Sequence, residues 1–402
     1  FDKATADVET LYGLGLEDLQ FWMHHWQKDG YDQGYPNDVM PPRRVWGGLA
    51  GLRELIQRSA DLGYGMGVHH NWLFNSLKKP GDSHLGNDGR IQANVEGGEY
   101  LKHRVALALV DEVEGEFHDE LGTRGTFSDS ITTGFPPVDL DSDTEDWGLV
   151  RAPVAAYLHV MERLREIHGS PSAGEGGLGG GNVLYAGTVD AMPGSLFIHA
   201  QPKATNRNGR FVDVLPHFAL GGMHELSVRA GIGPPRRFVA PDRWTMAGGF
   251  TAIERDLTRT MTVLLGNAGY HWWYQLTRPG TVARDWWSGR EAALALARPG
   301  IELTAVTYED ESGRVRDLEQ HLLAGGDLSI GAVRVHLTFA DGVELWANLT
   351  QGPWKPKGQD ETLAPMGHLL RHGEVLAGIL VRDGATVQVS TGPKQRWLDG
   401  RG

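Results

Sequence analysis

The first two hundred residues alternate between short apolar runs and longer segments in which apolar residues recur at helical spacing. The runs typical of buried strands are residues 19–26, 64–72, 125–133 and 182–192. The segments with one apolar helical stripe are residues 47–63, 99–122 and 147–169. A chain that repeats strand and helix in this order favours a parallel sheet, because consecutive parallel strands need a crossover connection.

The number of strand-helix units and the length of 402 residues favour a closed (β/α)₈ TIM-type barrel of the α/β class. An open doubly wound sheet is the second choice. The chain begins at Phe1 and shows no signal segment. We therefore expect a processed or truncated piece, in which the first strand of the barrel can be missing.

After about residue 298 the pattern changes to the alternation of a half-buried strand. In residues 332–354, Asp341-Gly342 is a tight hairpin signal between two alternating runs. We expect a catalytic barrel at residues 1–297 and a small antiparallel β domain at residues 298–402.

Composition excludes several function classes. The net charge of −13 argues against nucleic acid as a partner, since such binding rests on clustered Lys and Arg. No apolar run approaches the roughly 20 residues of a membrane span. The absence of cysteine excludes thiolate metal sites and Cys nucleophiles but leaves the compartment open. The glycine-rich residues 170–182 lie between a helix and a strand, so the dinucleotide pattern is not met and no organic cofactor is predicted.

The predicted strand exits are unusually polar, and in a parallel barrel the exits carry the catalytic groups. The exits carry His24, His25, Gln27, Lys28, Asp29, Tyr31, Asp32, His69, His70, Asn71, Asp129, Ser130, Thr132 and, after the next helix, Glu175. Asp129 lies in a run that otherwise suits the middle of a sheet, where an isolated carboxylate costs several kcal/mol unless it is paired or used.

Two carboxylates on neighbouring strand ends are the groups that glycosidic cleavage needs, one as nucleophile and one as acid/base. Asp129 and Glu175 are the predicted pair, with Glu225 as a rival acid. Either carboxylate also has a structural reading, as a hydrogen-bonded buried acid or as a solvated loop residue.

Four motifs occur in order: HHWQKDGYDQGYPND, GYGMGVHHN, TFSDS and GEGG. The ordered set resembles the strand-end motifs of the endo-α-N-acetylgalactosaminidase-like glycoside hydrolases and their uncharacterised relatives. The resemblance implies a (β/α)₈ barrel and a retaining mechanism, with Asp129 as nucleophile, Glu175 as acid/base and Asp32 in substrate binding. The sequence departs from the family pattern at Tyr31 and Gly176, which leaves the sugar open.

Around the catalytic pair we expect substrate-binding side chains that donate hydrogen bonds to sugar hydroxyls or stack on sugar rings. The predicted set is Asp32, Lys28, Tyr31, His25, His70, Asn71 and Trp273. The paired histidines also suggest zinc, but neighbouring residues of a strand face opposite sides, so only one of each pair can point inward. No metal is predicted, and His69 stays an alternative to His70.

The predicted function is retaining hydrolysis of a glycosidic bond in a neutral or N-acetylated oligosaccharide or glycoconjugate, with an α-galactosaminide-like sugar favoured. Two alternatives remain: a carbohydrate-binding barrel without catalysis, and a His-based metal-dependent hydrolase. The substrate class slightly favours an extracellular or cell-surface location.

Overall fold

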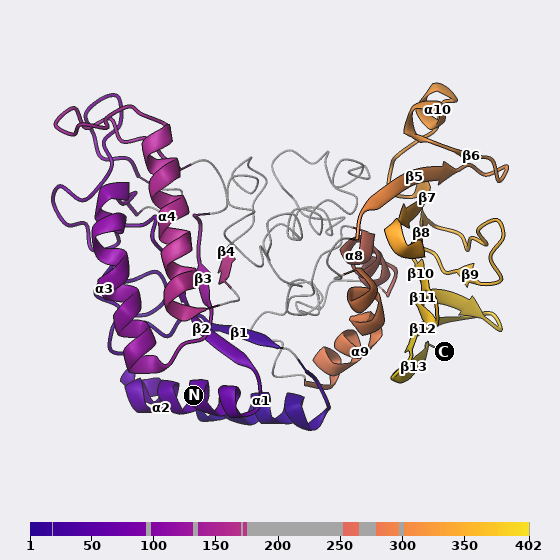
Figure 1. Cartoon of the computed structure of the whole chain (residues 1–402), viewed down its shortest axis with the longest axis horizontal. Coiled ribbons are helices and arrows are strands. Elements are labelled where there is room, and N and C mark those ends of the chain that lie inside the picture. The colour runs from indigo at the N-terminus through magenta and orange to yellow at the C-terminus, as the bar shows by residue number, and fades with distance from the viewer. Residues whose placement is uncertain are drawn as a thin grey trace. The chain divides into compact units, whose positions relative to one another are not determined.

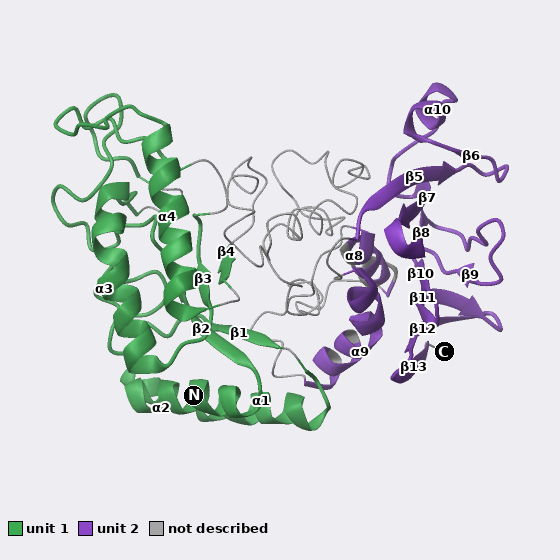
Figure 2. Cartoon of the chain, in the orientation of Figure 1, with its two compact units in different colours: residues 1–195 green, residues 196–402 purple. Residues whose placement is uncertain are grey.

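The computed structural model describes residues 1–17, 19–93, 98–131, 136–169, 172–174, 252–264, 279–296 and 301–401. The chain forms two compact units, Phe1–Ser195 and Leu196–Gly402 (Figure 2). Within the described ranges, no helix combines the length and the apolar character that crossing a membrane requires.

The first unit is built from helices and short parallel strands (Figure 1). Its elements are α1 (Asp2–Gly13), β1 (Gln20–Met23), η1 (Arg44–Trp46), α2 (Gly48–Asp61), β2 (Gly65–His70), α3 (His103–Leu121), β3 (Thr126–Ser128), α4 (Arg151–His168) and β4 (Ser172–Gly174). The strands lie in the order β1-β2-β3-β4, and every neighbouring pair is parallel. The predicted parallel α/β architecture is therefore confirmed for these four strands.

The predicted helices of this unit are confirmed, and each buries one stripe. In α2 the stripe is Leu52, Leu55 and Ile56, and α3 packs Val113 and Phe117 inward beside α4. Helices α2 and α4 contact the strands, α2 at β2 and α4 at β3 and β4, because each amphipathic helix has one face to remove from water.

Two elements of the first unit differ from the sequence prediction. Helix α1 was not predicted, although Ala4, Val8 and Leu11 form its buried stripe. Strand β4 occupies Ser172–Gly174, where a glycine-rich loop was expected. Its small side chains carry no strand signal of their own, so pairing with β3 decides their conformation. The predicted strand at 182–192 lies outside the described residues.

The second unit is an antiparallel sheet with helices. Its elements are α8 (Ala252–Leu264), α9 (Pro279–Leu296), β5 (Leu303–Glu309), β6 (Val315–Arg316), α10 (Leu318–Leu323), β7 (Ala332–Phe339), η6 (Ala340–Gly342), β8 (Glu344–Thr350), β9 (Thr362–Leu363), β10 (His368–His372), β11 (Val375–Arg382), β12 (Ala385–Gly392) and β13 (Gln395–Arg401). The sheet order is β13-β12-β11-β10-β8-β7-β5-β6, with β9 beside β11. Helix α9 packs against β11 and β12.

The β7–β8 hairpin forms as the alternation predicts. Asp341 and Gly342 have φ angles of 64° and 75°, the left-handed conformation that tight hairpin turns need. The face carrying Val335 and Leu337 pairs across to Leu345 and is fully buried. The antiparallel character predicted for this region is confirmed.

Candidate active site

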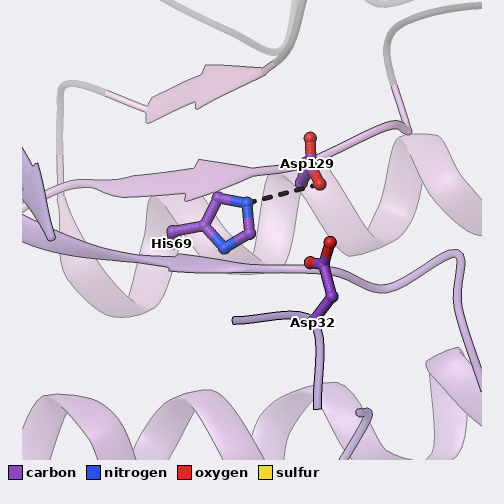
Figure 3. A group of neighbouring side chains, drawn as sticks. All are labelled: Asp32, His69 and Asp129. Atoms are coloured by element: carbon purple, nitrogen blue, oxygen red, sulfur yellow. Dashed lines mark ion pairs between the residues drawn. The ribbon is translucent and has the colours of Figure 1, made fainter. Parts of the chain in front are cut away.

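Three side chains from three strand exits of the first unit converge on one point (Figure 3). His69 lies near the end of β2, Asp129 follows the last residue of β3, and Asp32 lies in the loop after β1. One ligand atom from each of the three lies within 4.8 Å of the other two. The exits of parallel strands share one edge of a sheet, which explains how residues far apart in sequence meet here.

Asp129 lies one residue beyond β3 rather than within the strand. Its backbone N–H donates to the His70 carbonyl at 2.8 Å, and the residue is 7% exposed. The Asn71 amide donates to its Oδ2 at 3.3 Å, and His69 Nε2 lies 3.3 Å from the same oxygen. The carboxylate thus has two nitrogen neighbours, which offset part of the cost of its burial.

His69 is completely buried beneath the site and is held on both sides of its ring. Its Nδ1 lies 3.1 Å from the Tyr35 hydroxyl, and its ring stacks on Phe127 with centroids 5.5 Å apart. Burial, with a smaller contribution from His70, lowers the pKa of His69 to about 3. The imidazole is therefore neutral at pH 7.

Asn71 is fixed by its own backbone turn. Its Oδ1 accepts from the N–H groups of Leu73 and Phe74, which leaves the amide nitrogen directed at Asp129. The next residue, Trp72, donates its indole N–H to Glu114 at 2.7 Å. These contacts hold the exit of β2 in one conformation.

Three residues at the site have left-handed backbone conformations that side chains disfavour. His25, Asp32 and Ser130 have φ angles of 58°, 59° and 63°. Such conformations cost about 1 kcal/mol or more each and collect at functional sites, where surrounding contacts impose them.

An aromatic pair lies beside the acidic cluster. The exposed rings of His25 and Tyr31 stack with centroids 4.5 Å apart, and the Tyr31 ring is 5.1 Å from that of His69. The His24 ring lies closer to that of His69, at 4.3 Å, and burial first, then His69 and His25, keep its pKa well below the usual range. The site therefore combines a charged centre with a flat, accessible aromatic face.

The structure brings several predicted residues together and leaves others apart. Asp32, Asn71, Tyr31 and His25 lie around Asp129 and His69. Lys28 is instead exposed and pairs with Asp38 at 2.8 Å. Glu175, Glu225 and Trp273 lie outside the described residues.

His70 packs away from His69, against Trp72, Phe117 and Tyr35. The opposite orientation of the two histidines follows from strand geometry, so one of them points at Asp129. The sequence prediction chose His70 for substrate binding and kept His69 as its alternative, because period-two geometry alone does not show which of the two packs against Trp72 and Phe117. Tyr35 was also missed as a site residue, because only its contact with His69 marks it.

The same cluster is the set of described residues that could hold a metal ion. Asp32 and Asp129 offer carboxylate oxygens and His69 offers an imidazole nitrogen. Oxygen and imidazole donors suit several divalent cations. Binding through Nε2 would require that nitrogen to carry no proton.

A buried ionic network joins the loops that follow β2 and β3. Lys102, 2% exposed, pairs with Asp141 and lies 3.8 Å from Asp139. Asp139 also accepts the Leu85 N–H at 3.0 Å. This network fixes the two loops that flank the site.

No protein-family model and no curated protein matches the sequence. Among solved structures, the chain is similar to α-N-acetylgalactosaminidase NagBb from Bifidobacterium bifidum in its GalNAc complex, with a TM-score of 0.60 and 18% identity over 87% of this chain and 51% of that chain. For a quadruple mutant of NagBb, the TM-score is 0.58 and the identity is 17%, over 86% of this chain and 50% of that chain. For Ttha1563 from Thermus thermophilus, the TM-score is 0.50 and the identity is 14%, over 91% of this chain and 88% of that chain.

These likenesses show the fold. The resemblance derived from the ordered motifs is confirmed at that level, since NagBb is an α-N-acetylgalactosaminidase by name. The chain spans about half the length of the NagBb chains that it matches.

Proposed function

We propose that the protein is a retaining glycosidase acting on a neutral or N-acetylated sugar, with an α-N-acetylgalactosaminide favoured. The convergence of Asp32, His69 and Asp129 at the strand exits carries this proposal. The fold shared with NagBb supports the choice of sugar, because NagBb is named for that activity and was solved with GalNAc.

In the proposed mechanism, ionised Asp129 attacks the anomeric carbon while protonated Glu175 gives its proton to the leaving oxygen. Water, deprotonated by Glu175, then hydrolyses the glycosyl-enzyme with retention. The strand register supports this pairing: Ser128 pairs with Gly174, and Asp129 and Glu175 are the next residues along the chain. A retaining pair requires a carboxylate separation of about 5 to 5.5 Å.

The accessible His25 and Tyr31 rings suit stacking on the apolar C–H face of a sugar. Asp32 and Asn71 are polar groups of the kind that orient sugar hydroxyls. We further propose that residues 1–297 form a closed (β/α)₈ barrel and residues 298–402 an appended β domain, and that Lys28 and Trp273 contribute to substrate binding.

Hydrolysis of aryl α- and β-glycosides, including N-acetylgalactosaminides, tests the proposal. Wild type should turn over one of them, and Asp129→Asn and Glu175→Gln should not. Azide added to Glu175→Gln should give a glycosyl azide of retained configuration. Asp111→Asn is the control, because it neutralises an exposed aspartate of α3 that pairs with Arg163 at 2.7 Å and lies outside the cluster. An inert wild type that still binds glycans would favour the binding-module alternative.

The acidic cluster with His69 also favours a second candidate, the His-based metal-dependent hydrolase. In that case a chelator would abolish turnover and a divalent cation would restore it. The two-carboxylate mechanism needs no metal for the chemical step.

A further inference from the structure

A row of polar groups runs behind the site from Gln27 to Asp129. Gln27 Nε2 lies 2.9 Å from the Tyr35 hydroxyl, which lies 3.1 Å from His69 Nδ1. His69 Nε2 then lies 3.3 Å from Asp129 Oδ2. Gln27, Tyr35 and His69 are completely buried, and among the described residues neither Gln27 Oε1 nor His69 Nε2 has a hydrogen-bond partner.

A backbone carbonyl decides which atom of the Gln27 amide faces the Tyr35 hydroxyl. Gln27 Nε2 is also 3.3 Å from the His69 carbonyl oxygen, which can only accept. The amide nitrogen of Gln27, and not its oxygen, must therefore face both neighbours. Gln27 consequently donates to the Tyr35 hydroxyl.

The hydroxyl of Tyr35 has one proton and two acceptors in reach, His69 Nδ1 and the Asp32 carboxylate. Burial is the largest cause that raises the pKa of Tyr35, and the nearby Asp32 carboxylate is the next. If the proton goes to Asp32, His69 must carry its own proton on Nδ1. Its Nε2 lone pair then faces the Asp129 carboxylate across 3.3 Å. Two electron-rich groups at that distance in a buried site repel. With Asp129 ionised, the arrangement with the proton directed at His69 is favoured.

We infer that Tyr35 is a positioning residue, whose hydroxyl proton holds His69 as the Nε2–H tautomer, so that an N–H of His69 and not a lone pair lies beside Asp129 Oδ2, the oxygen to which Asn71 donates. The inference rests on the proposed function for its catalytic consequence, because it orients the carboxylate assigned as nucleophile. A contact of 3.3 Å is longer than the 2.7–2.9 Å typical of a charge-assisted bond. We therefore expect a moderate effect, roughly ten- to a hundred-fold, rather than the larger loss from removing the nucleophile itself.

The test is ¹⁵N NMR of the histidine ring nitrogens in the full chain, with the His69 signals assigned by their loss in His69→Gln. Wild type should show a protonated Nε2 and an unprotonated Nδ1 for His69. Tyr35→Phe should shift His69 toward the other tautomer. Tyr157→Phe is the matched control, because Tyr157 is also completely buried and its hydroxyl donates to the Leu101 carbonyl, at 3.1 Å; its His69 signals should match wild type.

Kinetics add the functional readout. Tyr35→Phe should lower kcat roughly ten- to a hundred-fold with little change in KM, and Tyr157→Phe should leave both near wild type. A wild-type His69 protonated on Nδ1, or an unchanged tautomer in Tyr35→Phe, would overturn the inference. The wild-type spectrum decides the tautomer even where Tyr35→Phe does not fold. A wild type that hydrolyses none of the glycosides would contradict the proposed function. The NMR spectrum would still test the tautomer of His69, because that measurement does not depend on turnover.

Discussion

The two units of the chain differ in what they bury. In the first unit, completely buried positions include Gln27, His69, Asn71 and Glu114. In the second, the β7–β8 hairpin buries an almost wholly apolar face that includes Leu337 and Leu345. Burying polar groups lowers stability unless each finds a partner, whereas apolar burial adds stability directly. The strand exits of the first unit therefore bury polar groups that need partners, whereas this hairpin face of the second unit adds stability directly.

The largest expected effect is a loss of turnover caused by a substitution in the first unit alone. Asp129→Asn should reduce turnover by more than about 10³-fold while changing the unfolding of the second unit little, because the substitution removes the proposed nucleophile and no apolar packing. Steady-state kinetics and a thermal melt of the same preparation measure both quantities. Residual turnover within ten-fold of wild type would remove Asp129 from the chemistry.

The second prediction concerns the buried charges of the first unit. Lys102→Met should lower the free energy of unfolding by about 3 kcal/mol, because it removes the buried lysine from Asp139 and Asp141 and leaves them only the partly exposed Arg104 as a charged partner. Lys3→Met is the control, since Lys3 pairs with Asp7 on the surface and its loss should change little. Denaturant titrations give the comparison, and equal stabilities for the two variants would mean that the network contributes nothing.

The third prediction concerns the apolar face of the second unit. Leu345→Ala should cost about 3 kcal/mol through lost apolar contact and the cavity left behind. Because Leu345 lies in a different unit from Asp129, kcat of the folded fraction should stay at the wild-type value. A loss of kcat without a loss of stability would contradict the separation of the two roles.

The fourth prediction concerns pH. Burial lowers the pKa of His69 to about 3 and the pKa values of His70 and His84 to about 4, whereas an unfolded histidine titrates near 6.5. Below pH 6.5 the unfolded chain binds protons that the folded chain does not, so stability falls as pH falls. Each histidine contributes a slope of about 1.4 kcal/mol per pH unit until its folded pKa is reached.

In the described part of the second unit, burial lowers the pKa of His368 to about 4 and also lowers the pKa of His336, so fewer histidines contribute than in the first unit. The first unit should therefore lose stability more steeply between pH 6.5 and 5. Amide hydrogen exchange at pH 7 and pH 5.5, resolved by peptide, compares the two units in one sample. Parallel loss of protection in both would contradict the prediction.

The sequence predicted the features that depend on local pattern. Amphipathic stripes located α2, α3 and α4, and the Asp341-Gly342 signal located the hairpin. It missed β4, because Ser172–Gly174 becomes a strand only through pairing with β3.

The candidate site was predictable in part. The strand-exit rule selected Asp32 and Asp129, which do converge. Period-two geometry showed that one of His69 and His70 faces inward, but it could not say which. That choice depends on where Phe117 and Trp72 pack, since these apolar rings enclose His70. The role inferred for Tyr35 depends on a contact across 34 residues of sequence, which no local pattern contains.

In the proposed mechanism, Asp129 forms a covalent bond with the sugar during turnover. Inactivation with an activated fluoro-glycoside of the sugar that wild type hydrolyses, followed by proteolysis and mass spectrometry, tests it directly. We expect a peptide that carries one added glycosyl mass on Asp129, and no such peptide from Asp129→Asn. A glycosyl mass on another carboxylate, or turnover with inverted product and no covalent species, would contradict it.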